Sequence, residues 1–204
     1  MTGESTLKAP LWQPRSVEET QEIYREWAQT YDADVLSSGY ATPARIAKAL
    51  SGFNLQGGAV LDYGCGTGLS GEALRDAGHT AIDGTDISHE MLHKAVAKDI
   101  YRETWMSKPG AFDFPNGKYS AIVAAGVVSL GAAPPETLAG LVSKLSTGQI
   151  LAFSYNDPTL AEQSYITALN ELTASGRVEL IFREHGPHLP EKGMGSEVIL
   201  LKAK

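Results

Sequence analysis

Two acidic residues and a set of alternating glycines are the residues whose types and spacing point to binding chemistry. In the run VLDYGCGTG an apolar segment ends at Asp62 and then breaks into Gly64, Gly66 and Gly68. Asp86 follows 22 residues after Gly64, at the end of a second short apolar run. Glycines let bare backbone N–H groups approach a ligand, and an acid at this distance is spaced to reach a ribose hydroxyl. The pattern predicts a site for a cofactor that contains a nucleoside.

A dinucleotide is the competing ligand for this loop. Residues 66–71 read GTGLSG, which matches the G-x-G-x-x-G fingerprint of dinucleotide-binding proteins. In such a site the first glycine directly follows the strand, so that the pyrophosphate reaches the helix N-terminus. Here the strand ends first in Asp62, whose carboxylate repels a pyrophosphate and favours an ammonium or sulfonium ligand. We therefore rank NAD well below a positively charged cofactor, which makes an NAD-dependent oxidoreductase the less favoured interpretation.

The elements that position these residues alternate between strand and helix, which is typical of a parallel sheet covered on both faces. The expected strands cover residues 59–63, 80–85, 103–106, 119–128, 149–155, 177–184 and 195–202. The expected helices between them cover residues 69–77, 88–101, 135–145 and 157–175. The loop at 186–193 joins neighbouring strands, which implies an antiparallel hairpin. The sequence predicts an α/β, Rossmann-like fold: a seven-stranded, mostly parallel sheet with helices on both faces and a C-terminal antiparallel hairpin.

The N-terminal region is expected to form a helical cap. Residues 1–15 show no periodic pattern and are predicted to be a flexible arm, and residues 16–204 a single domain. Ser16 and Glu19 have the spacing of a capping box, which predicts a helix that runs to about Tyr31. A second helix is expected at 43–51. Residues 16–52 then form a cap or lid on the sheet.

Composition limits the class of protein. The chain has 204 residues and a formal net charge of −7, which argues against binding to nucleic acid, where clustered Lys and Arg are needed. Cys65 is the only cysteine, so neither an internal disulfide nor a multi-cysteine metal site is expected, and we assign no metal ligands. The N-terminus lacks a signal pattern, and no apolar run is long enough to cross a membrane. We expect a cytoplasmic protein with no membrane partner, compatible with a monomer.

The motifs carry a family resemblance that covers nearly the whole chain. The segment LDYGCGTG at 61–68 resembles motif I of the class I methyltransferases that use S-adenosylmethionine, and GTDIS at 84–88 is similar to their second motif. The pattern Tyr24-x-x-Trp27-Ala28-x-x-Tyr31-Asp32 is similar to the N-terminal helix of the Williams–Beuren syndrome region methyltransferase-like family, as is the later Gly-Pro-His at 186–188.

The resemblance implies a role for each matching position. The backbone at Gly64 and Gly66 would approach the methionine moiety, Asp62 would hold the loop and the amino group, and Asp86 would accept hydrogen bonds from the ribose. Ile87 and Met91 would make apolar contacts to adenine or ribose. Tyr24 and Tyr31 would close over the cofactor. The full set of implied cofactor-binding residues is Tyr24, Tyr31, Asp62, Gly64, Cys65, Gly66, Gly68, Asp86, Ile87, Met91 and Ala125.

The sequence also departs from the family pattern. The segment Thr104–Lys108 lacks the acid that commonly contacts adenine, so Trp105 or Met106 would hold the base by stacking or apolar contact. The motif NDPT at 156–159 is interpreted as a turn with a helix N-cap. We assign no catalytic residue, because methyl transfer from a sulfonium mainly requires alignment and exclusion of water. The sequence predicts an S-adenosylmethionine-dependent methyltransferase with a small-molecule acceptor; the alternative is a non-catalytic S-adenosylmethionine-binding regulator.

Overall fold

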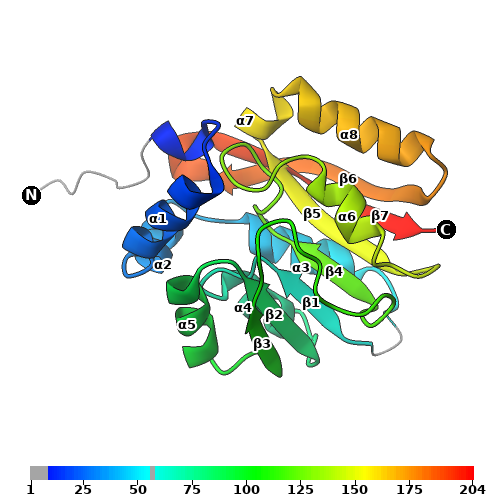
Figure 1. Ribbon diagram of the computed structural model, residues 1–204, viewed down its shortest axis with the longest axis horizontal. Helices are drawn as coiled ribbons and strands as arrows, with labels where there is room; N and C mark the ends of the chain where they lie inside the picture. Colours follow the sequence, from blue (N-terminus) through cyan, green and yellow to red (C-terminus); the bar gives the residue numbers. More distant parts are fainter. Residues whose placement is uncertain (1–8, 56–57) are drawn as a thin grey trace, which may run out of the picture.

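One mixed sheet organises the part of the chain that the computed structural model describes, residues 9–55 and 58–204 (Figure 1). Its seven strands lie in the order β3-β2-β1-β4-β5-β7-β6. β7 runs antiparallel to both of its neighbours, β5 and β6, and the other strand pairs are parallel. The predicted fold class, including the C-terminal hairpin, is therefore confirmed. The strands are β1 (Val60–Tyr63), β2 (Ile82–Asp86), β3 (Glu103–Met106), β4 (Ala121–Ala124), β5 (Ile150–Asn156), β6 (Val178–Leu189) and β7 (Met194–Ala203).

Helices cover both faces of the sheet and the carboxyl ends of its parallel strands (Figure 1). They are α1 (Val17–Trp27), α2 (Tyr31–Ser37), α3 (Thr42–Ser51), α4 (Leu69–Asp76), α5 (His89–Ala97), α6 (Thr137–Val142), α7 (Asp157–Leu160) and α8 (Gln163–Ala174), with short 3-10 turns at Ala9–Trp12 and Pro190–Lys192. In the described part of the chain, none of the helices combines the length and the apolar character needed to cross a bilayer.

Alternation along the central strands divides the core into two layers. Leu61 of β1 and Phe153 of β5 point to the face covered by α6 and α8. Val60 and Ala152, their neighbours in sequence, point to the face covered by α3 and α4. Successive side chains of a strand alternate between faces, so a strand that is buried on both sides reads as a continuous apolar run. β5, buried at every residue, is such a strand.

The N-terminal helix is shorter than the sequence predicts. The capping box of Ser16 and Glu19 is present, but α1 ends at Trp27 and Tyr31 begins a second helix. Trp27 donates its indole N–H to Asp34 of α2 at 2.7 Å. This contact joins residues seven apart across the break, and therefore stabilises a helix–turn–helix instead of one long helix.

Three other elements differ in extent from their predictions. β4 stops at Ala124 because Gly126 takes a positive φ of 71°, and the apolar residues that follow pack as a loop. The helix predicted at 157–175 is divided into α7 and α8. β6 continues to Leu189, so the segment predicted as a hairpin loop is mostly strand. Pairing with β7, the next strand of the hairpin, extends it to this point.

A β-bulge interrupts the pairing of β6 with β7 at His188. Pro187 pairs with Gly195 and Leu189 pairs with Met194, so His188 is the extra residue. His188 and Leu189 are both buried, whereas most other residues of β6 are exposed or half-buried. A bulge bends the strand and changes the direction of a side chain. Here it turns the imidazole of His188 into the protein.

We predict that Gly64→Ala destabilises the fold more than Gly148→Ala. Both glycines have a positive φ, 70° and 87°. A Cβ at Gly148 meets nothing within 4 Å, whereas one at Gly64 overlaps the side chain of Val127. The left-handed backbone alone costs about 1–2 kcal/mol, and overpacking adds roughly 1–3 kcal/mol. Urea unfolding of both variants measures the difference; equal losses would mean that Val127 moves aside freely.

Candidate functional site

A cavity of about 380 Å³ lies where β1, β2 and β4 end, beneath α1 and the start of α2. Its volume is in the range of small-molecule and cofactor sites. The carboxyl ends of parallel strands, at the point where strand order reverses between β1 and β4, are the usual ligand position in such sheets. Of the predicted site residues, those that line the cavity are Tyr24, Tyr31, Gly64, Gly66, Asp86, Ile87, Met91 and Ala125.

The carboxylate of Asp86 binds backbone N–H groups on both sides of the cavity floor. One oxygen accepts from Gly66 and the other from Ser88, each at 2.8 Å. Burial raises the pKa of this carboxyl, and these two N–H groups oppose the rise. A carboxylate has about four acceptor positions, so these bonds leave it able to accept a further donor. Asp86 can therefore hold the glycine loop and still accept hydroxyl groups of a ligand.

Asp62 does not line the cavity but lies beneath the glycine loop, with none of its surface exposed. Its Oδ2 accepts from the hydroxyls of Ser70 at 2.6 Å and Tyr101 at 2.7 Å. Its Oδ1 is buried and has no hydrogen-bond partner among the described residues. Burial raises the pKa of Asp62 to about 6. The position explains how Asp62 supports the loop, and the single free oxygen is its one available acceptor.

Cys65 and Gly68 also lie outside the cavity lining. The Cys65 side chain turns away from it and packs against Leu92, Ala95 and Tyr101. Gly68, with φ 94°, is the N-cap residue of α4. Both residues shape the loop by packing and by backbone conformation, while Gly64 and Gly66 form its exposed floor.

The expected adenine contacts also differ. Trp105 and Met106 do not line the cavity, and Met106 is 47% exposed. The loop after β3 lines this end of the cavity instead, with Ser107, Pro109 and Gly110. Sequence reasoning chose the strand residues by type, but the strand ends before it reaches the cavity.

Tyr24 and Tyr31 form the roof of the cavity from two different helices. We expected them on one helix, two turns apart; the break after Trp27 instead brings Tyr31 back towards Tyr24, with ring centroids 6.3 Å apart. Burial raises the pKa of both phenols, so they stay neutral at pH 7. Aromatic faces attract a cation such as a sulfonium.

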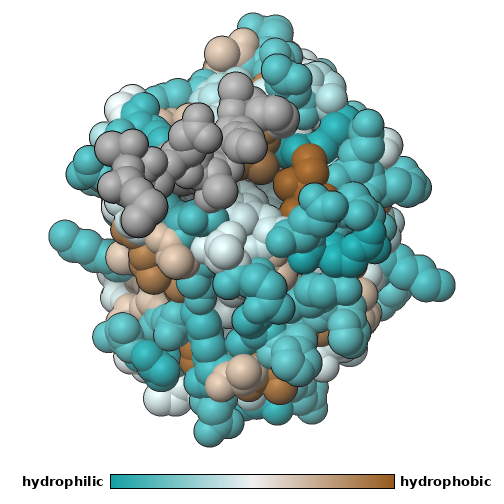
Figure 2. All heavy atoms as spheres, turned by 90° about the vertical axis from the view of Figure 1, so that its left-hand side faces the viewer, coloured by the Kyte–Doolittle hydropathy of each residue, from teal (hydrophilic) through white to brown (hydrophobic). Residues whose placement is uncertain are grey.

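The outer surface of this end of the molecule is mostly hydrophilic, with a few separate hydrophobic groups (Figure 2).

A smaller compartment of about 70 Å³ adjoins the cavity. The two share Tyr24, Tyr31, Gly126 and Ala132 in their linings. Beyond this shared wall the compartment is lined by Tyr40, Asn156 and His188, among others. Sequence reasoning did not assign these three to the site. They lie far apart in the sequence, and the one available signal was the resemblance at Gly-Pro-His.

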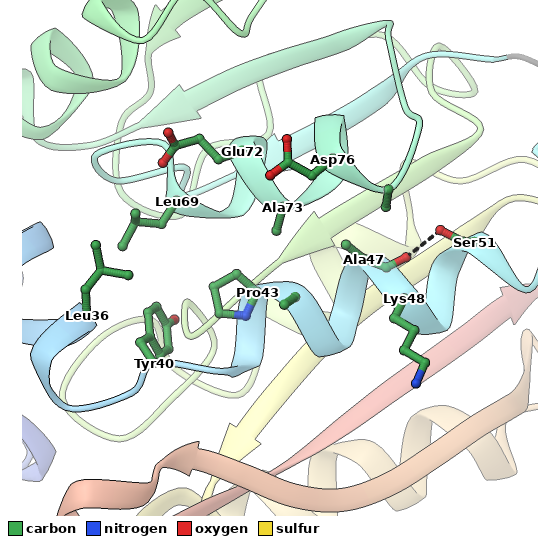
Figure 3. A pocket seen from close by; sticks show the side chains of 12 residues that line it. Leu36, Tyr40, Pro43, Ala47, Lys48, Ser51, Leu69, Glu72, Ala73 and Asp76 are labelled. Carbon is green, nitrogen blue, oxygen red and sulfur yellow. Dashed lines mark hydrogen bonds between the residues drawn. The ribbon is translucent and has the colours of Figure 1, made fainter.

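A separate groove of about 600 Å³ lies between α3 and α4 (Figure 3). In Figure 3 Leu36 and Tyr40 lie at one end, and Ser51, which donates to the carbonyl of Ala47, lies towards the other. None of the glycine-loop residues 64–68 lines it. The groove is therefore not the candidate site.

Comparisons with known proteins agree with this geometry. A methyltransferase domain family matches residues 31–196. Human methyltransferase-like protein 27 is 32% identical over 118 residues, covering 55% of this chain and 48% of that protein. A bovine 18S rRNA (guanine-N(7))-methyltransferase is 44% identical over 62 residues, covering 26% and 22%. The chain thus spans about half, or less, of these relatives.

A solved structure shows the same fold. It comes from the complex of the Haloferax volcanii Trm112 methyltransferase activator with a methyltransferase, at a TM-score of 0.68 and 15% identity over 88% of this chain and 97% of that one. The sheet, the cavity at its switch point and the glycine loop define a class I methyltransferase fold. The chain belongs to the methyltransferase domain family. The resemblance to class I methyltransferases is confirmed. A further structure of this fold is an S-adenosylmethionine-dependent methyltransferase from Mesorhizobium loti, at a TM-score of 0.55 and 17% identity over 71% of this chain and 90% of that one, and S-adenosylmethionine is the cofactor of the class.

We predict that Asp62→Asn changes the pH dependence of stability. Because the fold raises the pKa of this acid from 3.8 to about 6, the unfolded chain ionises first as the pH rises, and the folded state loses stability between about pH 4 and pH 6. The variant lacks this loss. Its unfolding free energy relative to the natural protein should rise by about 2 kcal/mol from pH 4.5 to pH 7.5. Urea unfolding at both pH values measures it, with exposed Asp76→Asn as control. A difference independent of pH would contradict the assignment.

Proposed function

We propose that this protein transfers the methyl group of S-adenosylmethionine to a small-molecule acceptor, and that the larger cavity holds the cofactor. The observation that carries the proposal is the paired arrangement of the Gly64–Gly66 turn and the Asp86 carboxylate at the switch point of the sheet. The cavity of about 380 Å³ suits a nucleoside with an amino-acid tail. A Cβ at Gly66 would meet nothing within 4 Å, so this turn leaves open space for a ligand.

The cavity residues have chemistry that suits each part of the cofactor. Asp86 would accept the ribose hydroxyls, and the apolar side chains of Ile87 and Met91 would contact ribose or adenine. The backbone of Gly64 would lie against the methionine moiety and that of Ala125 near the sulfur. Asp62, Cys65 and Gly68 would act from below the loop, through its shape and charge.

The bound cofactor supplies a methyl group that a sulfonium sulfur already activates. The tasks left to this chain are to align the acceptor, to exclude water and to favour the positive charge. Tyr24 and Tyr31 cover the cavity and turn aromatic rings to it. Asp86 adds negative charge beneath it. These groups support a methyltransferase that works by positioning, without an assigned general base.

We predict that S-adenosylhomocysteine raises the melting temperature of the protein and that NAD does not. At about 100 times the dissociation constant the stabilisation is roughly 2.7 kcal/mol. Asp86→Asn should weaken binding by about tenfold to a hundredfold, since it loses charge-assisted hydrogen bonds to the ribose. Exposed Asp76→Asn, the matched control, should bind normally. Calorimetry measures the affinities, and equal affinity for both variants would sink the ribose assignment.

The net charge of the chain and the space beside the cavity both limit the size of the acceptor. The net charge of −7 disfavours a polyanionic acceptor. The second compartment has only about 70 Å³ and lies behind the tyrosine wall. These features support a small acceptor. The matched relative named as an rRNA methyltransferase makes ribosomal RNA the second candidate.

A transfer assay separates the two acceptor classes. Methyl-tritiated S-adenosylmethionine is incubated with the protein and with the RNA or the low-mass fraction of a cell extract. We expect label in the low-mass fraction, because the surface charge repels RNA. A parallel reaction with Asp86→Asn measures the label that other enzymes incorporate, which is then subtracted. Nuclease-sensitive label in the RNA fraction would establish the second candidate instead.

A further inference from the structure

We propose that the compartment behind Tyr24 and Tyr31 is the acceptor subsite, and that Asn156 and His188 donate hydrogen bonds there to an oxygen of the methyl acceptor. The oxygen belongs to a carboxylate or a carbonyl group, which share the ability to accept such bonds. This inference rests on the proposed function, because it assigns the other half of the same site.

The compartment lies on the correct side of the cavity for an acceptor. Asp86 fixes the ribose position at the end of β2, on one side of β1. The compartment lies on the opposite side, at the ends of β4 and β5, where it shares Gly126 with the cavity. The two spaces adjoin along Tyr24, Tyr31 and Gly126, so a second reactant held in the compartment would lie next to the cofactor.

The amide of Asn156 has a fixed orientation. As N-cap of α7, its Oδ1 accepts from the Thr159 backbone N–H at 3.0 Å and from the Thr159 hydroxyl at 2.6 Å. The Thr159 hydroxyl in turn accepts from the N–H of Leu130 at 3.0 Å. Because both Thr159 groups donate, the amide atom that faces them is the oxygen. The NH₂ group of Asn156 therefore points away from the cap. It forms no hydrogen bond to another described residue, and Asn156 lines the compartment.

A chain of hydroxyls assigns the tautomer of His188. Its Nδ1 lies 2.7 Å from the Thr42 hydroxyl, which lies 2.9 Å from the Ser196 hydroxyl. Arg45 can only donate, and its Nη1 lies 3.1 Å from the Ser196 Oγ. Ser196 therefore donates to Thr42, and Thr42 donates to Nδ1. The reverse direction would leave the hydrogen of fully buried Ser196 without an acceptor among the described residues.

With Nδ1 as an acceptor, the neutral ring carries its proton on Nε2. Burial lowers the pKa of His188 to about 4, so the ring is neutral at pH 7. Nε2 forms no hydrogen bond to another described residue, and the bulge at His188 turns the ring into the compartment. His188 is thus a hydrogen-bond donor in the compartment, because the lone pair of Nδ1 already accepts from the Thr42 hydroxyl.

The walls of the compartment suit a flat acceptor molecule. Tyr40 packs edge-on against the His188 ring, with centroids 5.2 Å apart. The hydroxyls of Tyr24, Tyr31 and Tyr40 form no hydrogen bond to another described residue. Burial keeps all three phenols protonated at pH 7, because it raises the pKa of each. Donors from several directions and aromatic faces around them select an acceptor oxygen on a small, planar group.

The first test measures the tautomer in the free protein. Nitrogen-15 NMR of histidine-labelled protein, assigned with His188→Gln, should show a neutral ring with hydrogen on Nε2 at pH 7. Thr42→Val removes the hydroxyl that donates to Nδ1 and keeps the shape, so the Nδ1–H form should appear. A natural protein with hydrogen on Nδ1 would overturn the proposal, whether or not the variant folds.

The second test titrates three probes of one shape into protein saturated with S-adenosylhomocysteine. Benzoate and benzamide present acceptor oxygens, and benzylamine presents a cation. We expect benzoate, benzamide or both to shift the His188 Nε2 signal, and benzylamine to leave it unchanged. Asn156→Asp keeps the helix cap and replaces the donor by a carboxylate. It should weaken benzoate binding by at least about tenfold, while exposed Asn170→Asp should not.

The outcomes separate the two proposals. Binding of benzylamine alone, or of no probe, overturns the donor subsite even if S-adenosylhomocysteine binds normally. If S-adenosylhomocysteine fails to bind, the proposed function fails. The tautomer and the probe titration without cofactor analogue still test the donor arrangement in that case.

Discussion

The hydrogen bonds of the Asp86 carboxylate are the interaction on which the site depends. β1 and β2 run parallel and end side by side, and each is followed by backbone N–H groups that need acceptors. Asp86 takes the N–H of Gly66 from one strand end and that of Ser88 from the other. The carbonyl of Thr85 accepts from Gly64 and Cys65 as well. The left-handed turn of the loop is therefore fastened to β2, and the cavity above it has a rigid floor.

Local chemistry explains what the sequence could predict. The capping box at Ser16 and the N-cap at Ser88 each depend on neighbours within a few residues, and each is present. The incorrect boundaries depend on contacts between one element and the next. α1 ends early because Trp27 bonds to Asp34, and β6 is long because β7 pairs with it. An apolar run such as 119–128 is also compatible with either a strand or a buried loop.

The glycine-loop side of the site and the compartment side also differ in how far short sequence motifs predict them. The glycine loop and Asp86 belong to short motifs, so their placement at the cavity could be predicted from spacing. Cys65 and Gly68 belong to the same motif, yet the loop directs them to the core, which spacing alone does not reveal. The other half combines Tyr40, Asn156 and His188 from three separate elements. The sequence identifies Asn156 as a helix cap, and the structure shows that the cap uses only the oxygen of its amide.

The bulge in β6 has a consequence for how this protein can change over evolutionary time. Side chains of a strand alternate, so deleting the extra residue at His188 would restore regular pairing at that point and turn the side chains on one side of it to the opposite face. A gain or loss of a single codon in the hairpin would thus reverse which groups face the compartment, while the glycine loop and Asp86 stay untouched. Related chains could therefore diverge in acceptor preference through hairpin length, with no substitution at the cofactor end of the sheet.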